Sequence, residues 1–219
     1  MTIYMPTFKG QIAGMVLGDT YIGKDGGKNA RMRITHSESQ REYILHKKKI
    51  LEQLTSVHWY ELPPRGVKHP NIEMSITTRR HPFYTRVYDL AVREKKKTIN
   101  KTWLSWLNEE GLAIWYMDDG SLSKKWSYNK GGRYRIENRR VYINSCSYSL
   151  AENELLAEIL KEKFDLNFMV RKASEYKGRE YFRLQAGAKE ANKLFEIISP
   201  YVLPCLRYKM NMEYDSDSK

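Results

Sequence analysis

Two short stretches of the chain run from apolar residues into an aspartate, and these aspartates are the side chains best placed to do chemistry. Residues 12–19 read IAGMVLGD and residues 112–119 read LAIWYMDD, so the stretches end in Asp19 and Asp119. A helix carries partial negative charge at its C-terminal end, where an aspartate is disfavoured by roughly 0.3–1 kcal/mol. Two carboxylates at such ends therefore require a compensating cation or a solvated position.

The same two stretches indicate an internal duplication, because their aspartates lie about half a chain length apart in a chain of 219 residues. In the first stretch Gly14 and Gly18 are four residues apart and share one helix face. This spacing predicts close contact with a second helix. We expect that contact to bring the two acidic helix ends together.

The segments around these stretches predict the same order of elements in each half, namely helix, two strands, helix, two strands and helix. Strands are indicated by alternating apolar and polar residues, and a capping box at Ser149 and Glu152 predicts a helix start. We expect helices at 10–19, 39–54, 82–92, 111–119, 149–164 and 189–199, strands at 21–23, 29–36, 71–80, 120–125, 139–146, 166–170 and 179–186, and a long polar loop at 126–138.

The predicted fold class is α+β, with two pseudo-symmetric αββαββα halves that each contain an antiparallel sheet. The expected boundaries are an N-terminal half at 1–95, a connector at 96–110, a C-terminal half at 111–212 and a frayed tail at 213–219. An apolar content of 41% with 29% charged residues indicates a globular chain rather than a disordered one.

The charge balance favours a polyanionic partner, because 38 Lys and Arg outweigh 26 Asp and Glu for a net charge of +12. Nucleic acid is the first candidate and an anionic membrane surface the second. Two cysteines without a CxxC spacing indicate neither a disulfide framework nor a zinc site. No leader sequence and no apolar run near ~20 residues is visible. We expect an intracellular protein, in the cytoplasm of a prokaryotic or phage host or in an organelle, that is neither secreted nor membrane-bound.

The polar faces of the predicted strands are candidates for nucleic-acid contact, although such faces are often only solvated. A β-ribbon fits the major groove of B-DNA, so each sheet could form half of a DNA-binding saddle. The residues in the polar phase that we expect to face nucleic acid are Arg31, Arg33, Thr35, Ser75, Thr77, Arg79, Arg140, Tyr142, Asn144, Arg171, Arg179, Tyr181 and Arg183.

The two motif stretches, taken with their context, resemble the paired signatures of the LAGLIDADG homing endonucleases. The resemblance covers about residues 10–212, and several of its short sequence motifs are similar to those of the yeast mitochondrial intron-encoded branch of the family. The features that carry it are WYMDDG at 115–120, KKTI at 96–99, YVLP at 201–204 and YK at 208–209. The first copy departs from the family pattern at Thr20, and the second at Ile114 and Asp118, where the first copy has Gly14 and Gly18.

The resemblance implies a monomeric, site-specific endonuclease that makes double-strand breaks in a long DNA target. Asp19 and Asp119 would be catalytic and would bind two or more Mg²⁺ ions together with the backbone carbonyls of Gly18 and Asp118. Carboxylate and carbonyl oxygens are ligands that suit Mg²⁺. The basic active-site residues of the family correspond to Lys97 and Lys209, although Lys209 could equally contact phosphate or belong to a solvated tail.

Two alternatives of a different class remain open from the sequence. The same fold could serve an RNA-binding intron maturase, or a DNA-binding regulator without catalysis, although the intact aspartates argue against the regulator. Two other nuclease chemistries are disfavoured: Tyr21-Ile22-Gly23 has no Gly-Ile-Tyr partner upstream, and the second half has no histidine for a His-Asn-His site.

Overall fold

A computed structural model describes residues 5–64, 66, 71–128 and 134–210 of the chain. The expected α+β class and the order of elements in both halves are confirmed. The first half contains α1 (Met5–Leu17), β1 (Tyr21–Gly23), β2 (Arg31–Ser37), α2 (Arg41–Leu51), β3 (Val57–Leu62), β4 (Glu73–Thr78) and α3 (Pro82–Ala91). The second half contains α5 (Glu109–Asp119), β7 (Gly120–Tyr128), β8 (Tyr134–Ile143), α6 (Leu150–Phe164), β9 (Met169–Tyr176), β10 (Arg179–Gly187) and α7 (Ala188–Ile198).

The two halves build sheets of the same topology. The first sheet has the strand order β1-β2-β4-β3 and the second β7-β8-β10-β9, and every pairing in them is antiparallel. Between the halves lie a small ribbon of β5 (Val92–Arg93) and β6 (Lys96–Lys97), and the short helix α4 (Lys101–Leu104). Two 3₁₀ helices complete the described chain, η1 (Glu38–Gln40) and η2 (Pro204–Lys209).

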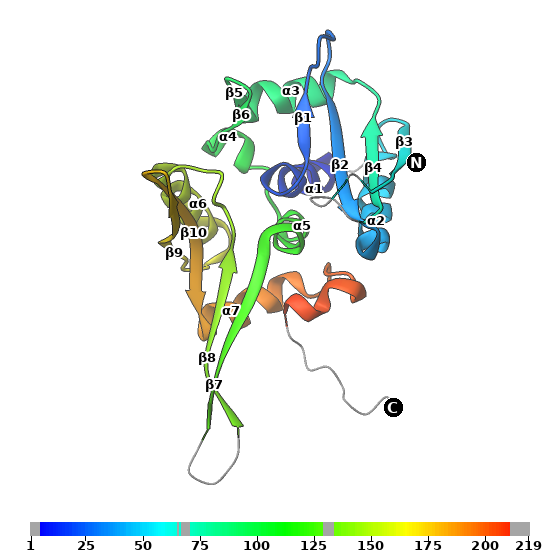
Figure 1. Ribbon diagram of the computed structural model, residues 1–219. Helices are drawn as coiled ribbons and strands as arrows, with labels where there is room; N and C mark the ends of the chain where they lie inside the picture. Colours follow the sequence, from blue (N-terminus) through cyan, green and yellow to red (C-terminus); the bar gives the residue numbers. More distant parts are fainter. Residues whose placement is uncertain (1–4, 65, 67–70, 129–133, 211–219) are drawn as a thin grey trace, which may run out of the picture.

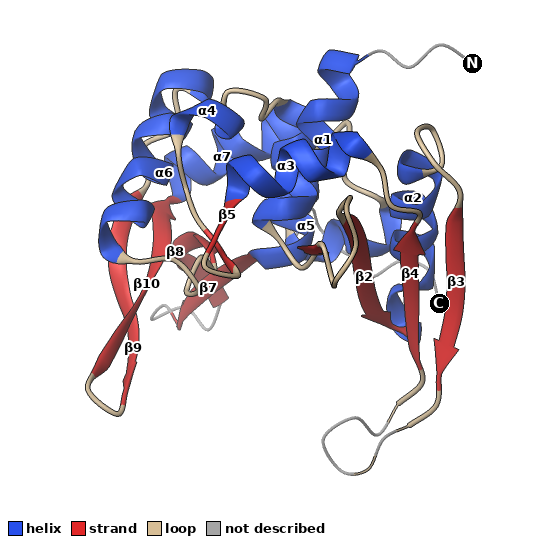
Figure 2. Cartoon of the chain, turned by 90° about the horizontal axis from the view of Figure 1, so that it is seen from above, coloured by secondary structure: helices blue, strands red, loops and turns tan. Residues whose placement is uncertain are grey.

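The sheets lie on opposite sides of the molecule, and the motif helices α1 and α5 lie between them (Figure 1). Figure 2 shows the helices gathered in one layer, while the strands of both sheets extend away from it on either side. This arrangement gives the saddle expected from the sequence. No helix within the described segments is long and apolar enough to cross a membrane.

The local patterns behind these elements are clear in β2 and α6. In β2, Met32 and Ile34 are fully buried while Arg33 and Thr35 are exposed, so the period-two alternation sets the two faces as predicted. At the start of α6 the hydroxyl of Ser149 accepts a hydrogen bond from the Glu152 N–H, and the Glu152 carboxylate accepts one from the Ser149 N–H. The predicted capping box is therefore confirmed.

Four expectations about the elements were wrong. The strand expected at 166–170 begins only at Met169 and continues to Tyr176, although Leu166 and Phe168 are buried. Helix α1 begins at Met5 rather than at residue 10. Strand β3 has a place in the expected order of elements, but no residue range was predicted for it, because it is an edge strand without a fully buried residue and its apolar alternation is weak. The predicted loop at 126–138 is largely a hairpin, since β7 continues to Tyr128 and β8 begins at Tyr134. The two strands of this arm pair antiparallel, with Trp126 opposite Ile136 and Tyr128 opposite Tyr134. The expected frayed tail at 213–219 lies outside the described residues.

Candidate active site at the crossing of the motif helices

Helices α1 and α5 meet through their backbones, as the glycine spacing predicted. A methyl group added at Gly14 would lie 2.0 Å from the carbonyl oxygen of Gly111, and one at Gly111 would lie 2.1 Å from that of Gly10. Such distances leave room for hydrogen only. Across the same interface the Gln11 amide donates to the Glu110 carboxylate at 2.7 Å. The close crossing brings the C-terminal ends of both helices to one place.

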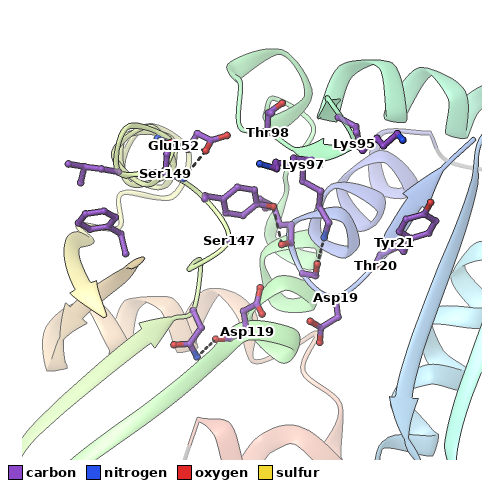
Figure 3. A pocket seen from close by; sticks show the side chains of 18 of the residues that line it. Asp19, Thr20, Tyr21, Lys95, Lys97, Thr98, Asp119, Ser147, Ser149 and Glu152 are labelled. Carbon is purple, nitrogen blue, oxygen red and sulfur yellow. Dashed lines mark hydrogen bonds between the residues drawn. The ribbon is translucent and has the colours of Figure 1, made fainter. Parts of the chain in front are cut away.

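The two predicted catalytic aspartates lie at these helix ends and line one pocket (Figure 3). Asp19 is exposed, whereas Asp119 is half-buried and accepts a hydrogen bond from the indole N–H of Trp115 at 3.1 Å. Burial raises the pKa of Asp119 from 3.8 to about 7, and the charges of Asp19 and Asp118 add to this effect. Partial removal from water also raises the pKa of Asp19, with Asp118 the second cause. Both carboxyls thus lie where a bound cation would be favourable.

A lysine from another segment of the chain lies at the C-terminal end of each motif helix. The ammonium of Lys97 donates to the carbonyls of Val16 at 2.9 Å and Gly18 at 2.5 Å. That of Lys209 donates to the carbonyls of Met117 at 2.6 Å and Asp118 at 3.0 Å. Burial lowers the pKa of both lysines. These cations satisfy carbonyls that have no partner within a helix and offset its negative end, which is the compensation that the sequence required.

Asp118 has a second role that the sequence did not predict. Its carboxylate is fully buried and accepts hydrogen bonds from the ammonium of Lys47 at 2.6 Å, the hydroxyl of Tyr43 at 2.8 Å and the N–H of Asp19 at 3.2 Å. Our expectation considered only the Asp118 carbonyl. Tyr43 and Lys47 stand four residues apart on one face of α2, so a lysine facing inward was the signal that could have revealed this cluster.

His36 completes the buried cluster as a neutral acceptor. Its ring nitrogen Nε2 lies 3.1 Å from the ammonium of Lys47. Burial, followed by the charge of Lys47, lowers the pKa of His36 to about 4. At neutral pH the ring is uncharged, and its Nε2 can accept a hydrogen bond from the Lys47 ammonium. The ion pair between Lys47 and Asp118 is therefore shielded from water and bonded on several sides.

Two grooves meet at Asp19. The first, about 630 Å³, runs over the polar face of the N-terminal sheet. The second, about 1070 Å³, contains both aspartates, all three lysines 95–97 and Arg179. Five of the predicted nucleic-acid residues line the first groove together with Tyr21, Tyr60 and Leu62, which sequence reasoning missed; the five are Arg31, Arg33, Thr35, Ser75 and Thr77. Ser75 and Thr77 are buried in its floor, and Arg79 follows the end of β4 and is exposed.

The C-terminal candidates lie mainly on the polar face of the second sheet. The guanidinium of Arg183 stacks over the ring of Tyr142, 4.1 Å from the ring centroid. In the register of β10 and β9, Arg183 lies opposite Arg171. Arg179 stacks over Tyr181 at 5.1 Å. Arg140 lies one pleat along β8 from Tyr142 and is exposed. These aromatic rings hold guanidinium groups in place on the face that we expect to meet nucleic acid.

Asn144 differs from the other candidates because it contacts one of the two motif aspartates. Both its N–H and its side-chain amide donate to the carbonyl of Asp119 at 3.0 Å. Over the described ranges, no group of three or more His, Cys, Asp and Glu side chains could hold a metal ion. A metal at this site would therefore depend on the two aspartates, backbone carbonyls and oxygen atoms from outside the protein.

The chain is similar to known proteins in sequence and in structure. The family model described as the LAGLIDADG DNA endonuclease family matches residues 9–194, a stretch that holds both motif helices. "Probable intron-encoded DNA endonuclease 3" of Mycosarcoma maydis is 33% identical over 135 residues, which cover 59% of this chain and 87% of that protein. "Probable intron-encoded endonuclease 1" of Wickerhamomyces canadensis is 26% identical over 206 residues, covering 91% and 81%.

Among solved structures, the homing endonuclease I-WcaI bound to its DNA recognition sequence has the same fold. The TM-score is 0.76 at 23% sequence identity, and the match covers 96% of this chain and 88% of that one. The likeness thus extends over both sheets and the crossing helices between them.

Proposed function

This chain belongs to the LAGLIDADG DNA endonuclease family, and from that premise we propose how its site cuts a long DNA target on both strands. The observation that carries the proposal is the pair Asp19 and Asp119, placed together at the ends of crossing helices with one lysine bonded to each end. Each helix end would serve one scissile phosphate. The enzyme is a site-specific DNA endonuclease of the homing type, and we propose that it is intron-encoded and acts as a monomer inside a cell or organelle.

We propose Mg²⁺, in two or more ions, as the cofactor. Mg²⁺ usually keeps several waters and binds one or two carboxylates together with substrate phosphates. That habit fits a site with two carboxyls of raised pKa and no third acidic ligand in the described part of the chain. Gly18 and Asp118 would add carbonyl oxygens, each of which has a second lone pair besides the one bonded to lysine. When bound, the ions would activate a water and stabilise the leaving oxygen.

The protein's own residues would orient this chemistry. Asp19 and Asp119 would hold the ions, while Lys97 and Lys209 keep the helix-end carbonyls aligned. Their ammonium groups also supply fixed positive charge beside the phosphates. Trp115 and Asn144 would restrain Asp119 from two directions, through its carboxylate and its carbonyl.

The substrate would be double-stranded DNA that lies across both sheets. The net charge of +12 favours association with a polyanion. The polar faces of both sheets carry arginines, several of them stacked on tyrosine rings. Arginine contacts guanine edges bidentately in the major groove and also contacts phosphates, so these faces could both read and hold the target.

The test is incubation of the purified protein and Mg²⁺ with a randomised duplex library, followed by sequencing of the cut ends. We expect one long consensus site, cut on both strands, with no cutting in EDTA. The double variant Asp19→Asn, Asp119→Asn should bind the selected site without cutting it. Cutting without site preference, or cutting that survives EDTA, would contradict the proposal. Binding without cutting by the unmodified chain, with help to intron splicing, would instead favour the maturase.

A further inference from the structure

The carboxylate of Asp118 connects the two halves of the molecule. It belongs to α5 of the second half, but its three donors, Lys47, Tyr43 and the N–H of Asp19, all belong to the first half. The side chains of Lys47 and Asp118 are both completely buried. A charged pair with no access to water is costly unless every polar group is bonded, and this pair is bonded on several sides. Its geometry therefore reaches the backbone of a catalytic residue.

This connection exists in one direction only. The first motif has Gly18 at the place that corresponds to Asp118, and a methyl group there would lie 2.2 Å from the Asp118 carboxylate. The space left by the glycine is filled by Asp118, so no reciprocal side chain fits. The two catalytic aspartates are consequently held by different means. Asp19 is held through its N–H, whereas Asp119 is held through its carboxylate by Trp115, where the first motif has Met15.

We propose that Lys47 and Asp118 are positioning residues for Asp19, and that they set the relative rates at which the two DNA strands are cut. The proposal rests on the proposed function, in which each motif helix serves one scissile phosphate. The ion pair fixes the peptide that leads into Asp19, at the point where α1 ends and its hydrogen bonds run out. A displacement near 1 Å at a reacting group can cost ~10²-fold in rate. Loss of this anchor should slow one strand and spare the other.

The test compares two double variants of nearly equal shape, Lys47→Met with Asp118→Asn and Lys47→Met with Asp118→Leu. Both remove the buried charges together, because removal of one partner leaves an uncompensated charge and risks unfolding. Only the asparagine keeps an oxygen that can accept the N–H of Asp19. Cleavage of a duplex labelled differently on each strand gives two rate constants. We expect their ratio to differ at least tenfold between the two variants.

A spectroscopic readout separates positioning from simple loss of stability. The amide proton of Asp19 should resonate upfield in the leucine variant relative to the asparagine variant, because its hydrogen bond is lost. Ile44→Val, in the buried core on the same helix as Lys47, serves as the control. It should lower the melting temperature without a change in the strand ratio.

The outcomes are distinguishable. Equal slowing of both strands in the leucine variant, or an Asp19 amide resonance that is the same in both double variants, would overturn the positioning role. If the unmodified chain cuts no DNA, the proposed function fails, whereas the amide comparison still tests the hydrogen bond. A strand ratio that shifts equally in Ile44→Val would also overturn the inference, because the effect would then follow stability alone.

Discussion

The helix crossing predicts a severe effect for the smallest possible substitution, Gly14→Ala. The added methyl would lie 2.0 Å from the carbonyl oxygen of Gly111, whereas ordinary contacts begin near 3.4 Å. Both atoms in conflict belong to, or are fixed by, the backbone, so no change of rotamer relieves the overlap. The two helices must move apart by more than about 1 Å at this point, given the same distances. That movement separates Asp19 from Asp119.

The magnitude follows from two opposing effects. Alanine is favoured over glycine in a helix by about 0.8–1.0 kcal/mol, which would stabilise the variant in open space. Overpacking in a closed interior typically costs about 1–3 kcal/mol and occasionally more, and a conflict between two backbones belongs to the upper part of that range. We therefore expect a net loss of about 1–2 kcal/mol in the free energy of unfolding. Cleavage should fall by roughly 10²-fold, because the catalytic ends are displaced.

Urea unfolding without metal measures the stability, and cleavage of the selected DNA site measures the activity. Gly187→Ala is the matched control, since this glycine has an ordinary φ of −83° and nothing within 4 Å of the added methyl. Gly187 is the N-cap of α7, where alanine is less favourable than glycine, so the control should lose less than about 1 kcal/mol and cleave at the unmodified rate. If Gly14→Ala shares the urea midpoint and cleavage rate of the control, the account of a backbone-to-backbone crossing is refuted.

Three further predictions follow from the site. In EDTA, Asp119→Asn should be more stable than the unmodified chain by up to roughly 4 kcal/mol at pH 8 and equally stable near pH 4. The reason is that the pKa of Asp119 is about 7 in the folded chain against an ordinary 3.8, so its carboxyl costs stability as the pH rises through that interval. Urea unfolding measured across this pH range would contradict the prediction if the stability difference did not change with pH. Lys97→Met or Lys209→Met should each slow cleavage by roughly 10²-fold with little change in DNA affinity, and a loss of binding instead would assign the lysine to DNA contact. Arg33→Ala should reduce the slope of log Kd against log salt by about 1 if it contacts phosphate, and an unchanged slope and affinity would place it off the DNA.

Local sequence was enough to predict the parts of the molecule that depend on nearby residues. The alternation of buried Met32 and Ile34 with exposed polar residues, and the capping box at Ser149, appear in the structure as predicted. Both follow from the period of the backbone and from helix ends that need partners close in sequence. The same reasoning placed Asp19 and Asp119 at acidic helix ends and indicated that the helices carrying them must touch.

Tertiary structure alone decided which residues meet at that contact. Gly14 packs on Gly111, a pairing that depends on how two helices cross and that no residue near either glycine specifies. From the sequence, Asp118 is a polar residue at a helix end. In the fold its carboxylate forms a buried ion pair with Lys47, which lies 71 positions away in the chain. The residue range of strand β3 was missed for a related reason, because an edge strand derives its place from a neighbour rather than from its own pattern. Periodicity reports which face of an element is buried, but the partner that buries it is a property of the assembled fold.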